Sequence, residues 1–454
     1  MPVFPEHPFP RPGAADYQAL GLRCGLEVHY QLDTRTKLFC RCPVGLRNDP
    51  PDAEIVRHMR PTLSELGEYD GTALMEFKTR KEVRYQLYYD TVCTYEMDDT
   101  PPFPLNQEAL DIALEIALLL NCRIVDEIHV SRKQYLDGSI PTGFQRTIAV
   151  GVDGWIPFRG RRIRVLQLCL EEDACREISD RGHVFVLRTD RLSTPLVEVI
   201  TAADMTTPGE AAAVDREIGR ILRATGKVRR GIGSVRQDVN VSIEGGARAE
   251  IKGVPRTGMI LPLVHYEALR QKALLSLGRE LENRGITRRV LTGGGASGRG
   301  AGSTPGGSRG RGVTPAGTLC TELFRGTRVR AIAESLLRGE EVGAVKLEGF
   351  AGLLGYPLGP GRSFADELRG RVRVIACLDR RPVLLHDDLA GGEDRGGGED
   401  PDGGEDLGGG EDRGSSDFPH PEKWRQVRDL VGAGPRDTVA LVWGPERDVR
   451  TALG

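Results

Sequence analysis

The sequence lacks the marks of a secreted or membrane-spanning protein. No apolar run approaches the roughly 18 residues that a membrane helix needs, and the proline-rich start, MPVFPEHPFPRPG, contains no apolar signal core. Nine cysteines, an odd number scattered over 454 residues, indicate reduced thiols rather than a disulfide framework. We therefore expect a soluble, cytoplasmic protein.

The net charge of −3 is unevenly distributed along the chain. Residues 387–417 carry twelve acidic and two basic side chains, which gives this segment a charge of −10 and leaves +7 on the remainder. A mildly basic body is compatible with a polyanionic partner but does not require one.

Two low-complexity segments divide the chain. Residues 292–317 are glycine-rich and predict a flexible linker. GGED recurs four times within 391–412, and because an apolar residue does not recur in each unit we predict disorder over 390–416 rather than a calcium-binding repeat. The expected parts are a proline-rich segment (1–17), a large core (18–291), the linker (292–317) and a smaller C-terminal domain (318–454).

The pattern of helices and strands favours the α+β class, with a large core built on mixed or antiparallel sheet and a smaller α+β domain after it. NQEALDIALEIALLLN (106–121) predicts a helix capped by Asn106. TPGEAAAVDREIGRILRATG (207–226) predicts another, with Thr207 as N-cap, Pro208 at the first position and Glu210 completing a capping box. The segments between and after them are typical of strands. Because helices and strands do not alternate strictly, a doubly wound fold is disfavoured.

Polar side chains gather on the faces of two predicted strand segments. GLEVHYQLD (25–33) alternates strictly, so Glu27 and His29 lie side by side, where they could bind a cation or face solvent. VRQDVNVSIEGGARAEIKGV (235–254) predicts a hairpin with a turn at Gly245-Gly246. One face of this hairpin carries Arg236, Asp238, Asn240, Arg248, Glu250 and Lys252. An ATP or RNA platform and solvated cross-strand ion pairs both fit that face.

A basic stretch precedes the hairpin. GKVRRGIG (226–233) places Lys227, Arg229 and Arg230 beside glycines, which would suit a phosphate or RNA backbone. It lacks the full Walker or Rossmann pattern, so a basic helix exit is the alternative.

Carboxylates occur where the chain otherwise predicts buried strands. In LCLEEDACREI (168–178), Glu171, Glu172 and Asp173 follow an apolar run, and Glu198 lies within the apolar TPLVEVIT. Such groups are costly to bury unless paired or bound to metal; Lys133 or Asp190-Arg191 could supply an ion pair for Glu198. With Glu27 and His29 they form an oxygen-rich set suited to Mg²⁺ or Mn²⁺. The residues thus predict a metal-dependent phosphoryl-transfer site, with Glu171 and Glu172 on opposite strand faces.

A second candidate metal site is sulfur-rich. Cys40 and Cys42 (FCRCP) with Cys93 and Glu96 (CTYE) offer three thiolates and a carboxylate, which is compatible with zinc but short of two CxxC pairs. An unrelated hydrolase using Glu171 or Glu198 as acid and base is a further alternative, which leaves the basic stretch at 227–236 unexplained.

Several ordered segments resemble one known family. The segments are GLEVHYQLDTRTKLFCRCP, RKQYLDGSIPTGFQRT, LCLEEDACREI, TDRLSTPLVEVITAADMTTPGEA and GKVRRGIGSVRQDVNVSIEGGARAEIKGV. They resemble the core of the B/E subunits of glutamyl-tRNA(Gln) amidotransferases, and the archaeal E subunit more than the bacterial B subunit. The part from TELFRGTRVRAIAESLL to LEGFAGLLGYPLGPGRSFADEL resembles the aspartyl-tRNA-synthetase-like insertion domain of that subunit.

The resemblance implies a reaction and its partners. Such subunits use ATP and Mg²⁺ to phosphorylate the γ-carboxylate of Glu-tRNA(Gln), and ammonia from a partner, here an asparaginase-like D subunit, displaces the phosphate. The implied Mg²⁺ ligands are His29, Glu172 and Glu198, with Glu27 and Glu171 lining an adjacent cation position. Glu172, Glu198 and Lys133 would be catalytic. The residues expected around ATP or the glutamyl end are Asp173, Lys133, Tyr135, Asp137, Arg236, Asp238, Asn240 and Lys252.

Two departures from the family pattern qualify these expectations. Bacterial relatives carry a CxC and CxxC zinc knuckle, whereas Glu96 stands here in place of the last cysteine. The chain also stops at Gly454, within the C-terminal domain (318–454) that the resemblance assigns to the insertion domain, so we expect a fragment, a split gene or a decayed copy. The alternative function is accordingly a non-catalytic or decayed tRNA-binding or assembly subunit.

Overall fold

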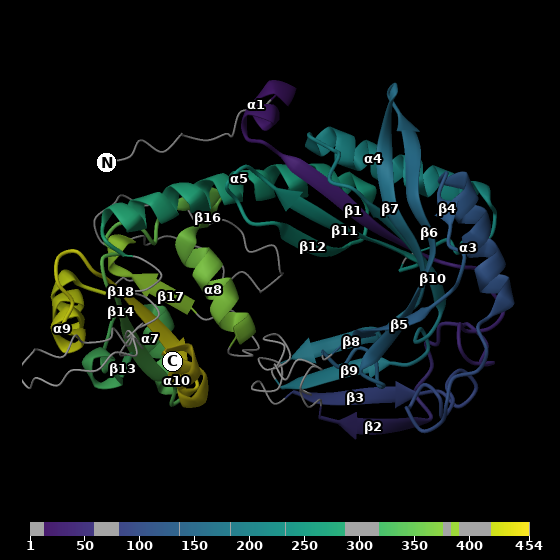
Figure 1. Ribbon diagram of the computed structural model, residues 1–454. Coiled ribbons are helices and arrows are strands. Elements are labelled where there is room, and N and C mark those ends of the chain that lie inside the picture. The colour runs from purple at the N-terminus through teal and green to yellow at the C-terminus, as the bar shows by residue number, and fades with distance from the viewer. Residues whose placement is uncertain are drawn as a thin grey trace, which may run out of the picture. The chain divides into compact units, whose positions relative to one another are not determined.

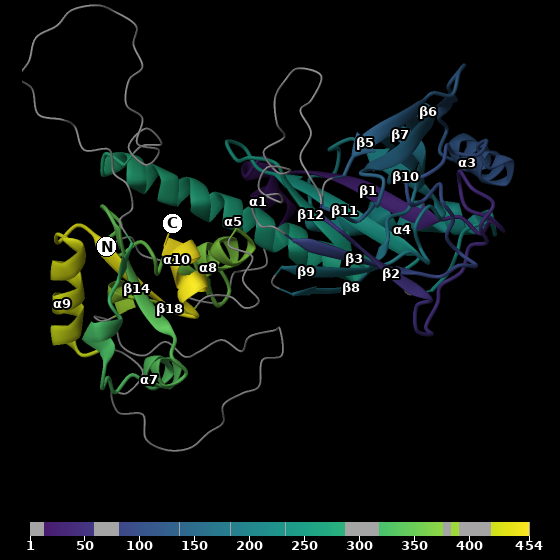
Figure 2. The same ribbon diagram turned by 90° about the horizontal axis from the view of Figure 1, so that it is seen from below.

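The structure is a computed structural model (Figures 1 and 2). The residues that it describes are 13–58, 81–135, 137–181, 183–231, 233–286, 317–375, 383–389 and 419–453. The first twelve residues, nearly all of the predicted linker and the whole acidic repeat lie outside these ranges. The chain forms two compact units, within Pro10–Lys272 and Ala273–Gly454, and the division falls inside helix α5 (Thr257–Asn283).

The larger unit is built on an eight-stranded antiparallel sheet. Its strand order is β12-β11-β1-β10-β7-β6-β4, and β5 pairs with β6. The strands are β1 (Arg23–Gln31), β4 (Arg123–Ile124), β5 (Val130–Gln134), β6 (Phe144–Phe158), β7 (Arg161–Glu172), β10 (Pro195–Thr201), β11 (Val235–Ser242) and β12 (Ala249–Val254). The predicted hairpin at 235–254 is confirmed as β11–β12, in which Asn240 pairs with Glu250.

A second sheet of four strands belongs to the same unit (Figure 1). Its strands are β2 (Ala53–Arg57), β3 (Glu82–Leu87), β8 (Arg176–Arg181) and β9 (Val184–Arg188). The order is β2-β3-β9-β8, with β3 and β9 parallel. Its buried core includes Tyr85, Ile140, Leu187 and Leu192. The unit therefore combines antiparallel and mixed sheets, as the sequence predicts.

Helices α3 (Gln107–Leu119) and α4 (Pro208–Ala224) cover the large sheet, α3 against β6 and β7 and α4 against β1. Both predicted N-caps are confirmed: the Asn106 side chain accepts from the Ala109 amide, and Thr207 accepts from the Glu210 amide. The capping box is not closed as expected, because the Glu210 carboxylate accepts from the Thr206 amide, one residue before the cap. Short helix α1 (Ala14–Ala19) precedes β1.

The smaller unit is also α+β. Strands β13 (Thr318–Leu319), β14 (Glu341–Leu347), β18 (Thr438–Gly444) and β17 (Val383–His386) form an antiparallel sheet in that order. Its other elements are η1 (Thr321–Phe324), α7 (Arg330–Leu337), β15 (Pro357–Gly359), β16 (Arg362–Ser363), α8 (Phe364–Ile375), η2 (Asp387–Leu389), α9 (Pro421–Val431) and α10 (Glu446–Leu453). Phe324, Ile332, Trp424 and Leu441 are buried in its core. Across the described parts of both units, no helix is long and apolar enough to cross a bilayer.

Candidate metal and nucleotide site

The register of three strands brings His29, Glu171 and Glu198 together. His29 on β1 lies opposite Glu198 on β10, and Glu198 lies opposite Cys169 on β7. Because side chains alternate along a strand, Glu171 is on the same sheet face as Cys169. One ligand atom from each of the three residues lies within 4.8 Å of the other two. We call these three residues the metal group.

Lys133 on β5 places a positive charge beside the two carboxylates of the metal group. Its ammonium lies 2.5 Å from Glu171 Oε1 and 3.2 Å from Glu198 Oε2. Thr147 donates to Glu171 Oε1 at 2.9 Å, and His29 Nε2 is 3.1 Å from Glu198 Oε1. Both carboxylates are buried, and the buried His29 Nδ1 has no hydrogen-bond partner among the described residues.

The charges within the metal group compensate one another. Burial alone would raise the pKa of Glu198, but the hydrogen bond from His29 and the charge of Lys133 lower it to about 2. The pKa of Glu171 is raised by burial and by the charge of Glu198. Burial lowers the pKa of His29, yet its bond to Glu198 and that carboxylate's charge leave it raised. Two carboxylates and an imidazole are a donor set that fits Mg²⁺ or Mn²⁺, whose charge would add to that of Lys133.

Glu172 points to the opposite face of β7 from Glu171. Its Oε1 accepts from the Tyr95 hydroxyl at 2.6 Å and from Ser193 Oγ at 3.0 Å, and its Oε2 accepts from the Arg146 amide at 3.1 Å. The structure therefore does not bring Glu172 together with His29 and Glu198, with which the resemblance grouped it. The strand alternation places Glu171 there instead.

Asp173 anchors a cation beside the metal group. It is fully buried, accepts from Arg236 Nη2 at 2.8 Å and from Gln31 Nε2 at 2.7 Å, and lies 3.6 Å from Arg191. Burial would raise its pKa, but the charges of Arg236 and Arg191 leave it lowered. Arg236 lies opposite His29 in the β1–β11 register, so its guanidinium is held on the same face as the metal group.

A second acidic group lies on the neighbouring strands. Glu27, Asp238 and Glu250 each offer an oxygen within 4.8 Å of the others. Asn240 donates to Glu27 Oε1 at 2.9 Å, and Lys252 lies 3.3 Å from Glu250. The structure thus places Glu27 with the predicted nucleotide-binding residues of β11 and β12, whereas Glu171 belongs to the metal group.

The other predicted residues are spread more widely. Tyr135 is half-buried against the core of the four-stranded sheet, and the charge of Glu171 adds to burial in raising its pKa. Asp137 accepts from the amide and hydroxyl of Ser139. Lys227 pairs with Glu115 of α3 at 2.6 Å, which favours the structural interpretation of the basic stretch for this lysine.

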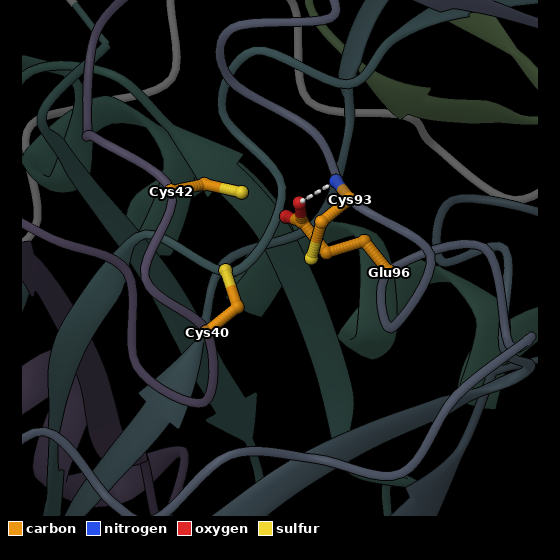
Figure 3. Close-up of side chains that lie close together, drawn as sticks. All are labelled: Cys40, Cys42, Cys93 and Glu96. Atoms are coloured by element: carbon orange, nitrogen blue, oxygen red, sulfur yellow. Dashed lines mark hydrogen bonds between the residues drawn. The ribbon is translucent and has the colours of Figure 1, made fainter.

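Cys40, Cys42, Cys93 and Glu96 form a third group, here called the thiol group. Their side chains point toward one another, with ligand atoms within 4.8 Å (Figure 3). Glu96 also bonds to Lys37, whose fully buried ammonium lies 2.6 Å from Glu96 Oε1. Sequence reasoning missed Lys37, because TRTKLFC has no periodicity that would indicate a buried lysine. It also missed Tyr95 and Ser193, which only the tertiary fold brings to Glu172.

Comparisons with known proteins agree on one family. A sequence model described as the GatB/GatE catalytic domain matches residues 22–323. The E subunits of archaeal glutamyl-tRNA(Gln) amidotransferases are similar to this chain: that of Methanocaldococcus jannaschii is 44% identical over 364 residues (80% of this chain, 54% of the relative). That of Caldivirga maquilingensis is 40% identical over 373 residues (82% and 56%), and that of Aeropyrum pernix is 40% identical over 358 residues (79% and 52%). The chain thus spans about half the length of these relatives.

Proposed function

Because the chain belongs to the GatB/GatE catalytic domain family, we propose that it carries the kinase and amidation site of a tRNA-dependent amidotransferase. The substrate would be Glu-tRNA(Gln). Its γ-carboxylate oxygen attacks the γ-phosphorus of ATP and ADP leaves; ammonia then attacks the acyl carbon and inorganic phosphate leaves, giving Gln-tRNA(Gln). The observation that carries the proposal is the buried metal group, because ionisable side chains are seldom buried together without a chemical role.

The metal group and Lys133 would carry out the phosphoryl transfer. Glu171 and Glu198 supply oxygens and His29 a nitrogen for Mg²⁺, which when bound would neutralise phosphoryl oxygens and orient the γ-phosphate. With a pKa of about 2, Glu198 is ionised at any physiological pH. Lys133 pairs with both Glu171 and Glu198, so its ammonium is already positioned to contact a phosphoryl group that enters the site.

The strands beside the metal group would hold ATP and the glutamyl end. Arg236 is fixed by Asp173, and Lys252 lies near Glu250, so two cations face the same region as Asp238 and Asn240. A cation held in place by a buried carboxylate, as Arg236 is by Asp173, suits phosphate recognition because it needs no reorganisation on binding. On this proposal Glu172 positions Tyr95 and Arg146 rather than binding metal.

The partners follow from the reaction. A tRNA supplies the glutamyl group, and an asparaginase-like subunit would deliver ammonia in the cytoplasm. The alternative, a non-catalytic tRNA-binding or assembly subunit, would have no use for the metal group. The catalytic and the non-catalytic function are distinguished by measuring whether the chain itself phosphorylates the substrate.

The test is conversion of Glu-tRNA(Gln) to Gln-tRNA(Gln) by the full chain with ATP, Mg²⁺ and free ammonium, which removes the need for an ammonia-delivering partner. Glu198→Gln keeps the shape of the side chain and removes a metal-binding charge. We expect product formation to fall by at least about 100-fold, because several kcal/mol of transition-state stabilisation are forfeited. Glu115→Gln, on the surface of α3, should leave the rate unchanged.

Two outcomes would count against the proposal. Unchanged turnover in Glu198→Gln would remove the metal group from the reaction. If the wild-type chain gives no product, a separately expressed C-terminal piece of a relative is added; continued inactivity, with Mn²⁺ binding also absent by electron paramagnetic resonance, would favour the non-catalytic alternative.

A further inference from the structure

The hairpin formed by β6 and β7 extends beyond the strands on both sides of it (Figure 1). β4 pairs with β6 as far as Val152, and β10 pairs with β7 as far as Val165. Beyond these points β6 and β7 pair with each other, up to Phe158 and Arg161. Residues 155–164, here called the hairpin tip, therefore have no third strand beside them among the described residues.

The two faces of the hairpin tip differ. Ile156 and Ile163 are fully buried on one face, and on that face Arg161 pairs with Glu210 in the first turn of α4 at 2.8 Å. The side chains on the opposite face are exposed or partly exposed: those of Trp155, Pro157, Arg162 and Arg164. We call the face that carries these four residues the open face.

The open face belongs to the sheet face that carries the metal group. A Cβ on Gly151 or on Gly154 would contact residues of α3 or the residues just after it, so both positions face the helices. Gly151 lies opposite Leu168 on β7, and Trp155 follows Gly154 on β6. Because side chains alternate along a strand, Trp155 and Glu171 both point away from α3.

Two arginines of the hairpin tip have no acidic partner among the described residues. The guanidinium of Arg162 lies over the ring of Trp155, 4.1 Å from its centroid, and that of Arg159 lies over the ring of Phe158 at 5.2 Å. The other two arginines of the tip are each paired with a carboxylate. A guanidinium that stacks on an aromatic ring keeps the N–H groups at its edge free to donate. The tip thus presents two oriented cations.

The turn of the hairpin places one of these cations in an unfavourable backbone conformation. Arg159 has φ of 47° and Gly160 has φ of 78°, as in a type I′ turn. Glycine adopts such a conformation readily, and asparagine and aspartate do so more readily than arginine. Backbone strain of this kind is concentrated at functional sites, so an arginine here favours a role in binding.

RNA fits the open face better than a protein partner does. A stable protein interface needs about 20–30 residues on each side, far more than the four side chains of the open face. A phosphate needs one arginine, and bases stack on aromatic rings. Arg162 and Glu171 are nine residues apart on β7, which is about 30 Å. An RNA whose reacting end lies at the metal group would reach the tip along the same sheet face.

We propose that the open face of the hairpin tip binds the sugar-phosphate backbone of the RNA substrate, with Arg159 and Arg162 each contacting a phosphate and Trp155 holding Arg162 in place. This inference rests on the proposed function, because it names a second contact of the RNA whose glutamyl end would react at the metal group. The contact is remote from the reacting atoms. It therefore contributes to RNA affinity and not to the chemical step.

The first experiment titrates the full chain with an unacylated tRNA(Gln) transcript, without ATP, over a range of salt concentrations. Arg159→Gln/Arg162→Gln should bind about tenfold more weakly at low salt, and the slope of log K against log salt should become shallower by about 2, one for each lost phosphate contact. The control Arg216→Gln/Arg220→Gln removes the same charge from exposed positions of α4, on the helix-covered side of the sheet, and should change both quantities much less.

Three outcomes of this titration would overturn the proposal. Equal losses in the two double variants would mean that only the net charge matters. Unchanged affinity in Arg159→Gln/Arg162→Gln is the result expected if the open face binds an acidic protein instead. A wild-type chain that binds no tRNA at low salt would exclude an RNA contact altogether.

The second experiment observes the hairpin tip directly. Trp155 is the single tryptophan of the larger unit, whereas Trp424 and Trp443 are buried in the core of the smaller unit. In the full chain labelled with 5-fluorotryptophan, Trp155→Phe assigns the fluorine resonance of Trp155. We expect that resonance to shift when tRNA is added and the other two to move less. Saturation with tRNA that leaves the Trp155 resonance unchanged would also overturn the proposal.

The conversion of Glu-tRNA(Gln) separates this inference from the proposed function. Arg159→Gln/Arg162→Gln should raise KM about tenfold and leave kcat within about twofold, whereas Glu198→Gln should lower the rate even at saturating RNA. If the arginine variant behaves like wild type while Glu198→Gln is inactive, the RNA contact is wrong and the proposed function stands. If the wild-type chain makes no product but its tip binds tRNA as described, the proposed function is wrong and the RNA contact stands.

Discussion

At the scale of single residues, Asp173 shows how a buried charge is held. Its carboxylate bonds to Arg236 and Gln31 and lies near Arg191, so its removal would leave two guanidiniums without a counter-charge. We predict that Asp173→Asn lowers the free energy of unfolding by about 3 kcal/mol, the lower end for a broken buried pair because both arginines are partly exposed. Chemical denaturation monitored by circular dichroism measures the change.

The control for Asp173 is Asp153→Asn, which disrupts an exposed pair with Arg123 and should cost under about 1 kcal/mol. The pH dependence adds a second check. The pKa of Asp173 is lowered from 3.8, so its stabilising effect is present above pH 3.8 and is lost as the pH falls through the folded-state pKa. The difference between wild type and Asp173→Asn should be constant above that pH and shrink below it; a constant difference throughout would contradict the assignment.

At the scale of elements, the sequence predicts which side chains share one face of a strand, but it does not predict which strands pair with each other. The sequence predicts Glu27 and His29 on one face of β1, and Glu171 and Glu172 on opposite faces of β7; the structure confirms both. Which glutamate joins His29 depends on the β1–β10 and β10–β7 registers, which place Glu198 opposite both His29 and Cys169. Strand pairing is a tertiary property, so no local pattern could have identified Glu171 as the partner.

The contact between β6 and the residues that follow α3 gives a prediction at the same scale. A Cβ on Gly154 would clash with Cys122 Sγ and lie 2.7 Å from the Leu120 carbonyl oxygen, and that carbonyl cannot rotate away. Gly154→Ala should therefore destabilise the protein by about 1–3 kcal/mol. Gly209→Ala, near the start of α4 with open space around it, should be neutral or stabilising in the same denaturation experiment. Equal effects of the two substitutions would show that packing against Leu120 and Cys122 is not the cause.

At the scale of the whole molecule, the metal, acidic and thiol groups all belong to the unit within Pro10–Lys272. The sequence predicts a boundary at the glycine-rich segment, yet the compact units divide earlier, inside α5. The reason is that Leu277 and Ile286 pack with Phe350 and Leu353 of the smaller unit. Helical periodicity reveals that a residue is buried but not which core receives it, so this division could not be predicted.

The acidic segment bears on the charge of the whole molecule. Residues 390–416 contain nine acidic and two basic side chains, so deleting them changes the net charge from −3 to +4. We predict that the deletion strengthens tRNA binding on the order of tenfold at low salt, because a repulsive field is removed, and that the gain disappears as salt screens it. The melting temperature should not change, since Leu407 is the only large apolar side chain in the segment and cannot build a core alone.

The measurement is a tRNA titration over a range of salt concentrations for four chains: wild type, the deletion, a variant with the nine acids replaced by asparagine and glutamine, and a variant with the segment's residues shuffled. Because neutralising nine acids changes the net charge from −3 to +6, the neutralised variant should bind at least as tightly as the deletion if charge is the cause, and the shuffled variant should bind like wild type. A neutralised variant that binds like wild type while the deletion binds more tightly would mean that the length of the segment, not its charge, restricts access to the basic body. A fall in melting temperature on deletion would show that the segment contributes to folding, contrary to what its composition predicts.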